Sequence, residues 1–345
     1  VSILVTYLGL KFSKTFFLLM GSSSEVILLG LEYTNVIFSG SIIFISVVAL
    51  NALLHAEGDT KTYRNILILS FFLNIFLNPL FIFGYAFIPA MGVTGIGIAT
   101  IVSQLIAFLV ILFRVLKNKR MLDFSLEFFY PKTNILKNLF LQSAPISAAL
   151  LSFTIGNTII LTYIGIFGEY ATAGYGSAAR FEQVLLLPVL GLNTAIISII
   201  AQNYGAKNFL RVKESYFKAI KYGFIIMIFS GLIIFFSADR IVSIFSDNTA
   251  VIEFGARYLR ISAFMFPAYP IFFISNGFFM SLKKSENALI SNLIRNIFLP
   301  LFAFYLAKYI NGSFNTFFWS YCYFNWFYVL ILFFFVTFYI KRKLN

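Results

Sequence analysis

The sequence has little of the chemistry on which enzymes and secreted proteins rely. It contains one cysteine, Cys322, and one histidine, His55, among 345 residues. A single cysteine excludes a framework of disulfide bonds, and a single histidine argues against a histidine-based metal site. The sequence also lacks a glycine-rich phosphate loop with its lysine and lacks a nucleophile elbow, so ATP-driven transport and most hydrolytic chemistry find no support. We therefore expect no metal, no cofactor and no enzymatic activity.

Charged residues are also scarce. They make up 11% of the chain, whereas 60% of the residues are apolar and the mean hydropathy is +0.90. These values exclude a water-soluble globule and indicate a multi-pass membrane protein whose main partner is the lipid bilayer. The net charge of +13 does not indicate nucleic-acid binding, because the basic residues lie in separate connections and not on one continuous face.

The apolar residues form runs long enough to cross a bilayer, which takes about 20 helical residues. A shorter run, Val1–Leu10, is followed by Lys11 and Lys14 and is expected to be a truncated span. The sequence predicts nine full spans after it, at Leu31–Leu54, Ile66–Ile88, Val93–Leu116, Leu139–Phe167, Thr172–Ala201, Tyr216–Ser237, Phe254–Leu282, Ala288–Ile310 and Phe314–Ile340.

The connections between these spans alternate between basic and nearly uncharged. This alternation is typical of the positive-inside rule and predicts that the basic connections face the cytoplasm. The expected location is the plasma or inner membrane of a prokaryotic cell. The longest basic stretch divides the chain into three expected parts. They are an N-terminal lobe at residues 1–116, a cytoplasmic linker at 117–138 and a C-terminal lobe at 139–345.

An internal repeat supports two similar halves. The segment VILLGLEY, which ends at Tyr33, resembles VIEFGARY, which ends 225 residues later at Tyr258, and the same offset places Asn51 on Asn276. Both copies lead from a poorly charged connection to a basic one, so we expect a parallel repeat of two pseudo-symmetric all-α bundles. The offset also implies that roughly 90 residues, or two to three spans of an expected twelve, are missing before Val1.

Several segments of the chain form a recognisable series. They are, in order, LNIFLNPLFIFG, GVTGIGIATIVSQ, the Ala144–Pro145 pair, AARFEQVLLLPVLGLNTA and AQNYGAKN. Together they resemble the multidrug and toxic compound extrusion (MATE) transporters. The similarity extends over nearly the whole chain, from the end of the third span to the twelfth. It implies a twelve-helix secondary antiporter that exports organic, often cationic, compounds while protons or sodium ions enter, by alternating access.

The resemblance also implies an ion-coupling network in the first lobe. In one branch of the family an aspartate on the first span acts with polar residues on later spans. The matching residues here are Tyr33, Asn74, Asn78 and Thr100. The chain departs from this pattern because the first span is absent and Asn78 stands where the family has a second aspartate. In another branch the ion is bound by acids on the seventh and tenth spans, where this chain has no acid near Phe153 or Tyr269.

One carboxylate, Glu182, is predicted well inside a span, about 15 Å from the end of its helix. A carboxylate at that depth needs a proton, an ion pair or water. Two interpretations stand equally. Glu182 exchanges a proton for a cationic substrate, or it forms a structural pair with Arg180 or Arg295. The predicted cavity residues are Glu182, Arg180, Asn157, Tyr269 and Asn276, and the predicted hinge residues are Pro267 and Pro270.

Two other functions remain open. A flippase for lipid-linked oligosaccharides shares the doubled architecture and would need a broad cationic cavity, for which Arg180 and Arg295 are thin support. A polytopic membrane enzyme would need clustered His, Asp or Ser near one interface, and the sequence contains no such cluster. The preferred hypothesis is a monomeric antiporter for a small organic molecule, with H+ or Na+ as the coupling ion.

Replacing Asn74 or Asn78 by leucine in the full-length protein is expected to reduce proton-driven efflux of a fluorescent cation, because the amides support the coupling acid. Efflux from energised cells measures the effect, and the amount of protein in the membrane fraction serves as the control. Unchanged efflux would remove both residues from the mechanism.

Overall fold

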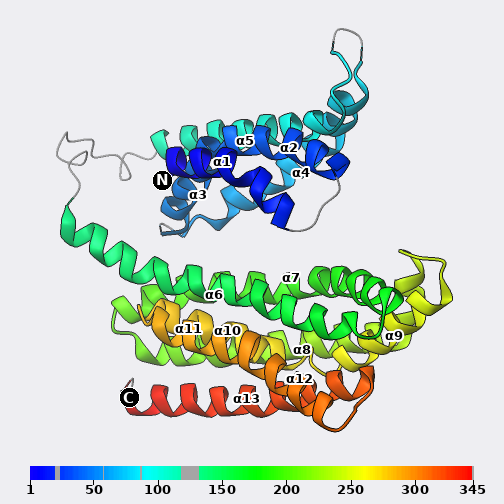
Figure 1. The fold of residues 1–345 in the computed structure, drawn as a ribbon. Helices are drawn as coiled ribbons and strands as arrows, with labels where there is room; N and C mark the ends of the chain where they lie inside the picture. The colour runs from blue at the N-terminus through cyan, green and yellow to red at the C-terminus, as the bar shows by residue number, and fades with distance from the viewer. Residues whose placement is uncertain (20–23, 57, 86–87, 118–131, 344–345) are drawn as a thin grey trace. The chain divides into compact units, whose positions relative to one another are not determined.

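The computed structural model describes residues 1–19, 24–56, 58–85, 88–117 and 132–343, and nearly all of them are helical (Figure 1). The chain divides into two compact units, Val1–Tyr130 and Pro131–Asn345. Most of the predicted linker, residues 118–131, lies outside the described residues. The helix that follows begins at Thr133, before the predicted end of the linker at 138.

In unit 1, α5 packs against three of the other helices, and α1 packs against α2 and α3. α5 contacts α2, α3 and α4, and its buried face contains small residues that include Gly95, Gly97 and Ala99. Small side chains let helices approach closely within a membrane. The first helix continues beyond Lys11 and Lys14, so the predicted Val1–Leu10 run is only part of it. The helices are α1 (Ser2–Leu19), α2 (Ser24–Ser39), α3 (Ser41–Ala56), α4 (Thr60–Phe83) and α5 (Gly92–Lys117).

In unit 2, α7 is in contact with α8, α9 and α10, and α13 is in contact with α9, α10 and α12. These contacts enclose most of the buried apolar side chains of the unit. The elements are α6 (Thr133–Gly165), α7 (Glu169–Gly205), α8 (Phe209–Ser243), α9 (Thr249–Ser262), α10 (Ala268–Ser281), α11 (Ser285–Leu293), the π-helix η3 (Ile294–Phe298), α12 (Leu299–Tyr309) and α13 (Phe314–Lys343).

Two predicted spans are not continuous helices. The span predicted at Leu31–Leu54 consists of α2 and α3, which meet at Gly40 with a bend of 49°. The span predicted at Phe254–Leu282 consists of α9 and α10, separated by residues 263–267. Glycine allows an irregular backbone, and Pro267 at the beginning of α10 lacks an amide hydrogen, so both positions can interrupt a helix. Seven other helical segments of the described chain are long and apolar enough to cross a membrane.

The internal repeat is present in the helix boundaries. The 225-residue offset carries the first residues of α2 and α4 onto the first residues of α9 and α11. Packing repeats as well, because α5 contacts α2, α3 and α4 within unit 1, as α13 contacts α9, α10 and α12 within unit 2. The copies differ in one respect. α4 is uninterrupted, whereas its counterpart contains η3 between α11 and α12. The prediction of two similar helical bundles is therefore confirmed.

Short polar side chains begin several of the helices. Asp59 accepts hydrogen bonds from the backbone N–H of Thr62 at 3.0 Å and from its hydroxyl at 2.6 Å. These bonds satisfy groups that the first turn of α4 leaves without a helical partner, and they hold the pKa of Asp59 below its usual range. Asn208 and Asn248 cap α8 and α9 in the same way. In these three connections a polar side chain therefore caps the N-terminus of the helix that follows.

A close contact fixes the position of η3 against α6. A Cβ atom added to Gly156 of α6 would lie 1.9 Å from the carbonyl oxygen of Asn296. Any side chain at this position would push η3 away from α6. η3 carries the residues Arg295 and Asn296, so the glycine sets how closely these residues approach α6.

Replacing Gly156 by alanine is expected to destabilise the protein by about 1–3 kcal/mol, because the backbone must move to admit a methyl group. Thermal unfolding in detergent measures the loss. The matched control is Gly176→Ala in α7, where an added Cβ meets nothing within 4 Å and helix propensity favours alanine. Equal melting temperatures for the two variants would contradict the close packing of α6 and η3.

Candidate functional site

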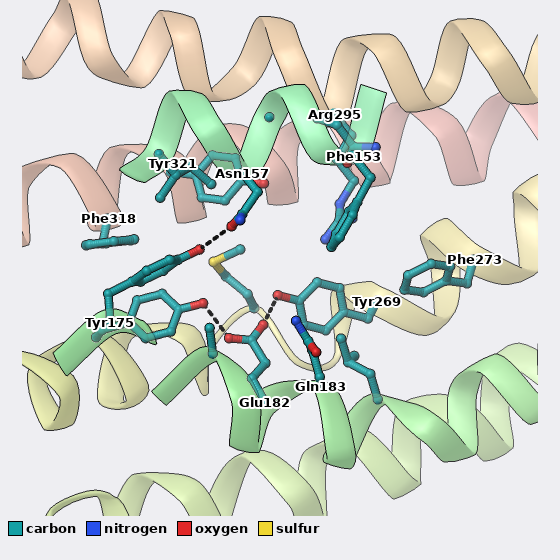
Figure 2. Close-up of a pocket in the computed structure, with 17 residues that line it drawn as sticks. Phe153, Asn157, Tyr175, Glu182, Gln183, Tyr269, Phe273, Arg295, Phe318 and Tyr321 are labelled. Atoms are coloured by element: carbon teal, nitrogen blue, oxygen red, sulfur yellow. Dashed lines mark hydrogen bonds between the residues drawn. The ribbon is translucent and has the colours of Figure 1, made fainter. Parts of the chain in front are cut away.

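The centre of the candidate site is Glu182, on α7. Its side chain is buried, with 6% of its surface exposed. The carboxylate accepts hydrogen bonds from the hydroxyl groups of Tyr258 on α9 and Tyr269 on α10. Figure 2 shows the hydroxyl of Tyr269 pointing to this carboxylate. The break between α9 and α10 brings tyrosines from two helices to the same carboxylate.

Arg295 is the second buried charge. It lies in η3 with 5% of its surface exposed, and its Nε donates to Oδ1 of Asn325 at 3.0 Å. Its guanidinium carbon lies 4.9 Å from the ring centroid of Tyr269 and 4.3 Å from that of Phe272. No carboxylate of the described residues lies within ion-pair distance of Arg295. Arg295 is therefore held by an amide and by aromatic faces.

These two charges border a cavity of about 110 Å³ within unit 2. The cavity has room for several water molecules or part of a small organic molecule. On one side Tyr175 donates a hydrogen bond to Oδ1 of Asn157 at 3.2 Å (Figure 2). Aromatic side chains supply much of the wall, including Phe153, Phe273 and Phe318. The cavity thus combines flat apolar surfaces with two opposite charges.

A polar cluster lies beside the cavity, where α10, α11, η3 and α6 meet. Asn296 donates to Oγ of Ser152 at 3.2 Å and to Oδ1 of Asn292 at 3.4 Å. Asn292 in turn donates to Oδ1 of Asn276 at 3.1 Å, and Asn276 donates to Oγ of Ser291 at 3.3 Å. Asn296 also lines the cavity, so the cluster continues the polar surface of the cavity into the helix interface.

The structure places the predicted cavity residues in three environments. Glu182, Asn157 and Tyr269 line the cavity. Asn276 is buried in the adjacent polar cluster and does not line the cavity. Arg180 is exposed and lies outside the cavity, because residues two apart on a helix point to different faces.

The predicted hinge residues lie where one span divides into two helices. Pro267 caps the beginning of α10, and Pro270 lies in the first turn of that helix. Between them, Tyr269 points its hydroxyl to Glu182. The position of the tyrosine therefore depends on the local geometry of this helix break.

In unit 1 the predicted ion-coupling residues are only partly connected. Asn74 donates to Oγ of Ser103 at 2.9 Å, and Ser103 donates to the carbonyl oxygen of Thr100 at 2.9 Å. Oδ1 of Asn78 is buried and accepts no hydrogen bond from the described residues. Tyr33 is 36% exposed, and within the described part of unit 1 its hydroxyl is not bonded to the other three. α4 and α5 therefore connect Asn74 to Ser103, whereas the hydroxyl of Thr100 donates within its own helix to the carbonyl oxygen of Ile96.

Sequence reasoning missed several residues of this site. The sequence pattern does not predict that Tyr175 and Asn296 line a cavity or that Ser103 joins the unit 1 network, and it marks Tyr258 only as part of the repeat. It indicates Arg295 only as a partner for Glu182 or a phosphate. A signal was present, because Arg295 and Asn296 are adjacent polar residues within a mainly apolar span. Among the described residues no cluster of His, Cys, Asp or Glu could hold a metal ion.

Comparisons with known proteins identify similar sequences over most of the chain. The family model described as MatE matches residues 1–80 and 145–306. The "FAD transporter" of Shewanella oneidensis is 26% identical over 311 residues, which are 88% of this chain and 68% of that protein. The "Probable multidrug resistance protein YpnP" of Bacillus subtilis is 27% identical over 305 residues, 87% of this chain and 67% of that protein.

Solved structures share the fold as well. A MOP superfamily transporter from Pyrococcus furiosus matches with a TM-score of 0.91 and 25% identity, covering 99% of this chain and 76% of that chain. An outward-facing multidrug resistance MATE family transporter gives the same TM-score, identity and coverage. The chain spans about two thirds of the length of the two curated relatives described above.

Replacing Tyr258 or Tyr269 by phenylalanine is expected to cost about 1–3 kcal/mol of stability, because each change removes one donor from a buried acceptor. Unfolding in detergent measures each loss. Tyr305→Phe is the control, because Tyr305 is 65% exposed. The two losses should be smaller in a Glu182→Leu background, where the shared acceptor is gone. Losses that do not change in that background would contradict a common role in holding the carboxylate.

Proposed function

We propose a function on one premise: this chain belongs to the MatE family of multi-pass membrane transporters, whose model matches well over half of it. The proposed activity is antiport, in which a small organic compound that carries a positive charge leaves the cell while protons or sodium ions enter. A single chain is the proposed transporting unit. The binding site would face the two sides of the membrane alternately.

The observation that carries this proposal is the environment of Glu182. The carboxylate is buried and receives two hydroxyl hydrogen bonds, yet no basic side chain of the described residues forms an ion pair with it. An ionised carboxylate inside a membrane protein costs several kcal/mol unless a cation, a proton or water compensates it. A cavity lies directly beside it. Glu182 is therefore suited to bind a cation that enters through this cavity.

Exchange follows from the competition for one carboxylate. A proton or a sodium ion and an organic cation would each neutralise Glu182, but both cannot do so together. Release of one then favours binding of the other, which is the requirement for antiport at a shared site. The aromatic walls of the cavity, including Tyr175 and Phe318, would accommodate the flat or apolar part of the compound.

We propose a second ion site in unit 1, around Asn74 and Asn78. Support comes from the buried Oδ1 of Asn78, which has no donor within the described residues, and from the chain of hydrogen bonds through Ser103. An amide oxygen without a donor can accept a bond from a protonated acid or contribute to a sodium site. The corresponding positions in unit 2, Leu299 and Ala303, are apolar, so the shared architecture does not require this polarity.

The two relatives are not named for the same substrate, so we infer the substrate class from the residues that line the cavity. Their names refer both to FAD and to multiple drugs. A flippase for lipid-linked oligosaccharides would need several cations for a pyrophosphate, whereas Arg295 is the one basic residue among those lining the cavity. An aromatic organic compound with a positively charged group agrees better with the lining residues.

Replacing Glu182 by glutamine is expected to reduce gradient-driven transport of a fluorescent organic cation at least tenfold, because the negative charge that binds the cation is lost. The side chain keeps nearly the same shape, and its amide oxygen can still accept one of the two tyrosine hydrogen bonds. Proteoliposomes with an imposed proton gradient, and separately a sodium gradient, measure transport and identify the ion. Glu169→Gln is the matched control, because Glu169 is exposed on the first turn of the same helix. Wild-type transport by the Glu182→Gln variant would disprove the proposed role.

A further inference from the structure

We infer that the cavity of unit 2 also contains an anion subsite at Arg295, so that its preferred ligands are zwitterions with a cationic nitrogen group and a carboxylate group. This inference rests on the proposed transport function and specifies its substrate class. The two charged residues of the cavity, Glu182 and Arg295, would bind opposite ends of the same molecule.

Arg295 has donors that no protein group uses. Its Nε is bonded to Asn325, but no acceptor of the described residues bonds to its terminal nitrogens. These terminal nitrogens are also absent from the fully buried atoms that lack a partner, and the residue lines the cavity. Two donors in a planar fork are therefore accessible from the cavity. A carboxylate is the group that such a fork binds best, through two parallel hydrogen bonds.

Neighbouring groups add further donors at the same end. Nδ2 of Asn325 is buried without an acceptor, and its identity as the donor follows because its Oδ1 receives the bond from Arg295. Tyr321 lines the cavity, and its hydroxyl makes no hydrogen bond within the described chain. Buried donors without acceptors are rare in folded proteins. Of these two groups only Tyr321 lines the cavity, so its hydroxyl is the further donor that can reach an anionic ligand group beside Arg295.

Glu182 and Arg295 contact different parts of Tyr269. Arg295 stacks against its face, whereas Glu182 accepts a hydrogen bond from its hydroxyl. This arrangement explains why the two charges form no ion pair although both border the same cavity. A ligand that contacts both residues would carry its charges about one aromatic ring apart.

Charge balance favours a zwitterion over a simple cation. A cation would neutralise Glu182 but leave Arg295 as an unpaired buried charge beside it. A buried charge that is left without a partner of opposite sign lowers the stability of the protein. A zwitterion compensates both residues and adds no net charge to the cavity. Arg295 would then determine specificity by binding the carboxylate of the ligand.

A matched pair of dyes tests this inference with the full chain reconstituted in nanodiscs. One probe is a rhodamine with a free carboxylate, which is a zwitterion, and the other is its methyl ester, which is a cation. Arg295→Gln is expected to weaken binding of the zwitterion at least tenfold, measured by fluorescence polarisation, and to leave binding of the ester unchanged or stronger. Arg295→Lys should recover part of the affinity for the zwitterion, since it keeps the charge but loses the fork.

Binding of the ester by the same variants is the control for folding. Equal loss of both probes in Arg295→Gln, with wild-type binding intact, would overturn the anion subsite and leave the proposed transport function standing. Binding of the zwitterion but not the ester by the wild-type chain would support the subsite and contradict a preference for simple cations. Binding of neither probe by the wild-type chain would overturn both proposals.

Discussion

A charge buried in a membrane protein must be compensated, and this constraint explains the arrangement of unit 2. Glu182 and Arg295 are the only charged side chains that are buried among the described residues. Hydroxyl groups from α9 and α10 hold the first, and an amide and aromatic faces hold the second. Neither Glu182 nor Arg295 forms an ion pair with another described residue. The protein therefore keeps two opposite charges available to a ligand in one cavity.

Irregular helices provide the geometry for this compensation. The break between α9 and α10 lets Tyr258 and Tyr269 reach the same carboxylate from different helices. The π-helix η3 carries Arg295, and Gly156 on α6 allows it to pack closely. π-helical turns are rare and occur often at functional sites. The regular parts of the bundle thus supply the membrane-spanning frame, and its irregular parts supply the polar groups.

The two units share a helix order and a packing pattern but differ in chemistry. α5 in unit 1 and α13 in unit 2 pack against corresponding helices. The buried acid and the buried base are both in unit 2, whereas the buried polar residues of unit 1, among those described, are serines such as Ser103. A repeat constrains the backbone strongly and the polar side chains weakly. Different tasks for the two units are consistent with this difference.

The sequence by itself determined the helical membrane architecture, the internal repeat and the choice of Glu182, because hydropathy and residue spacing are local properties of the chain. Only the tertiary structure decided which groups meet that carboxylate. Tyr258 and Tyr269 follow it by 76 and 87 residues, whereas Arg180, two residues away, points to another face. Contacts between helices depend on their breaks and packing, and these are set by the whole bundle and not by any single span.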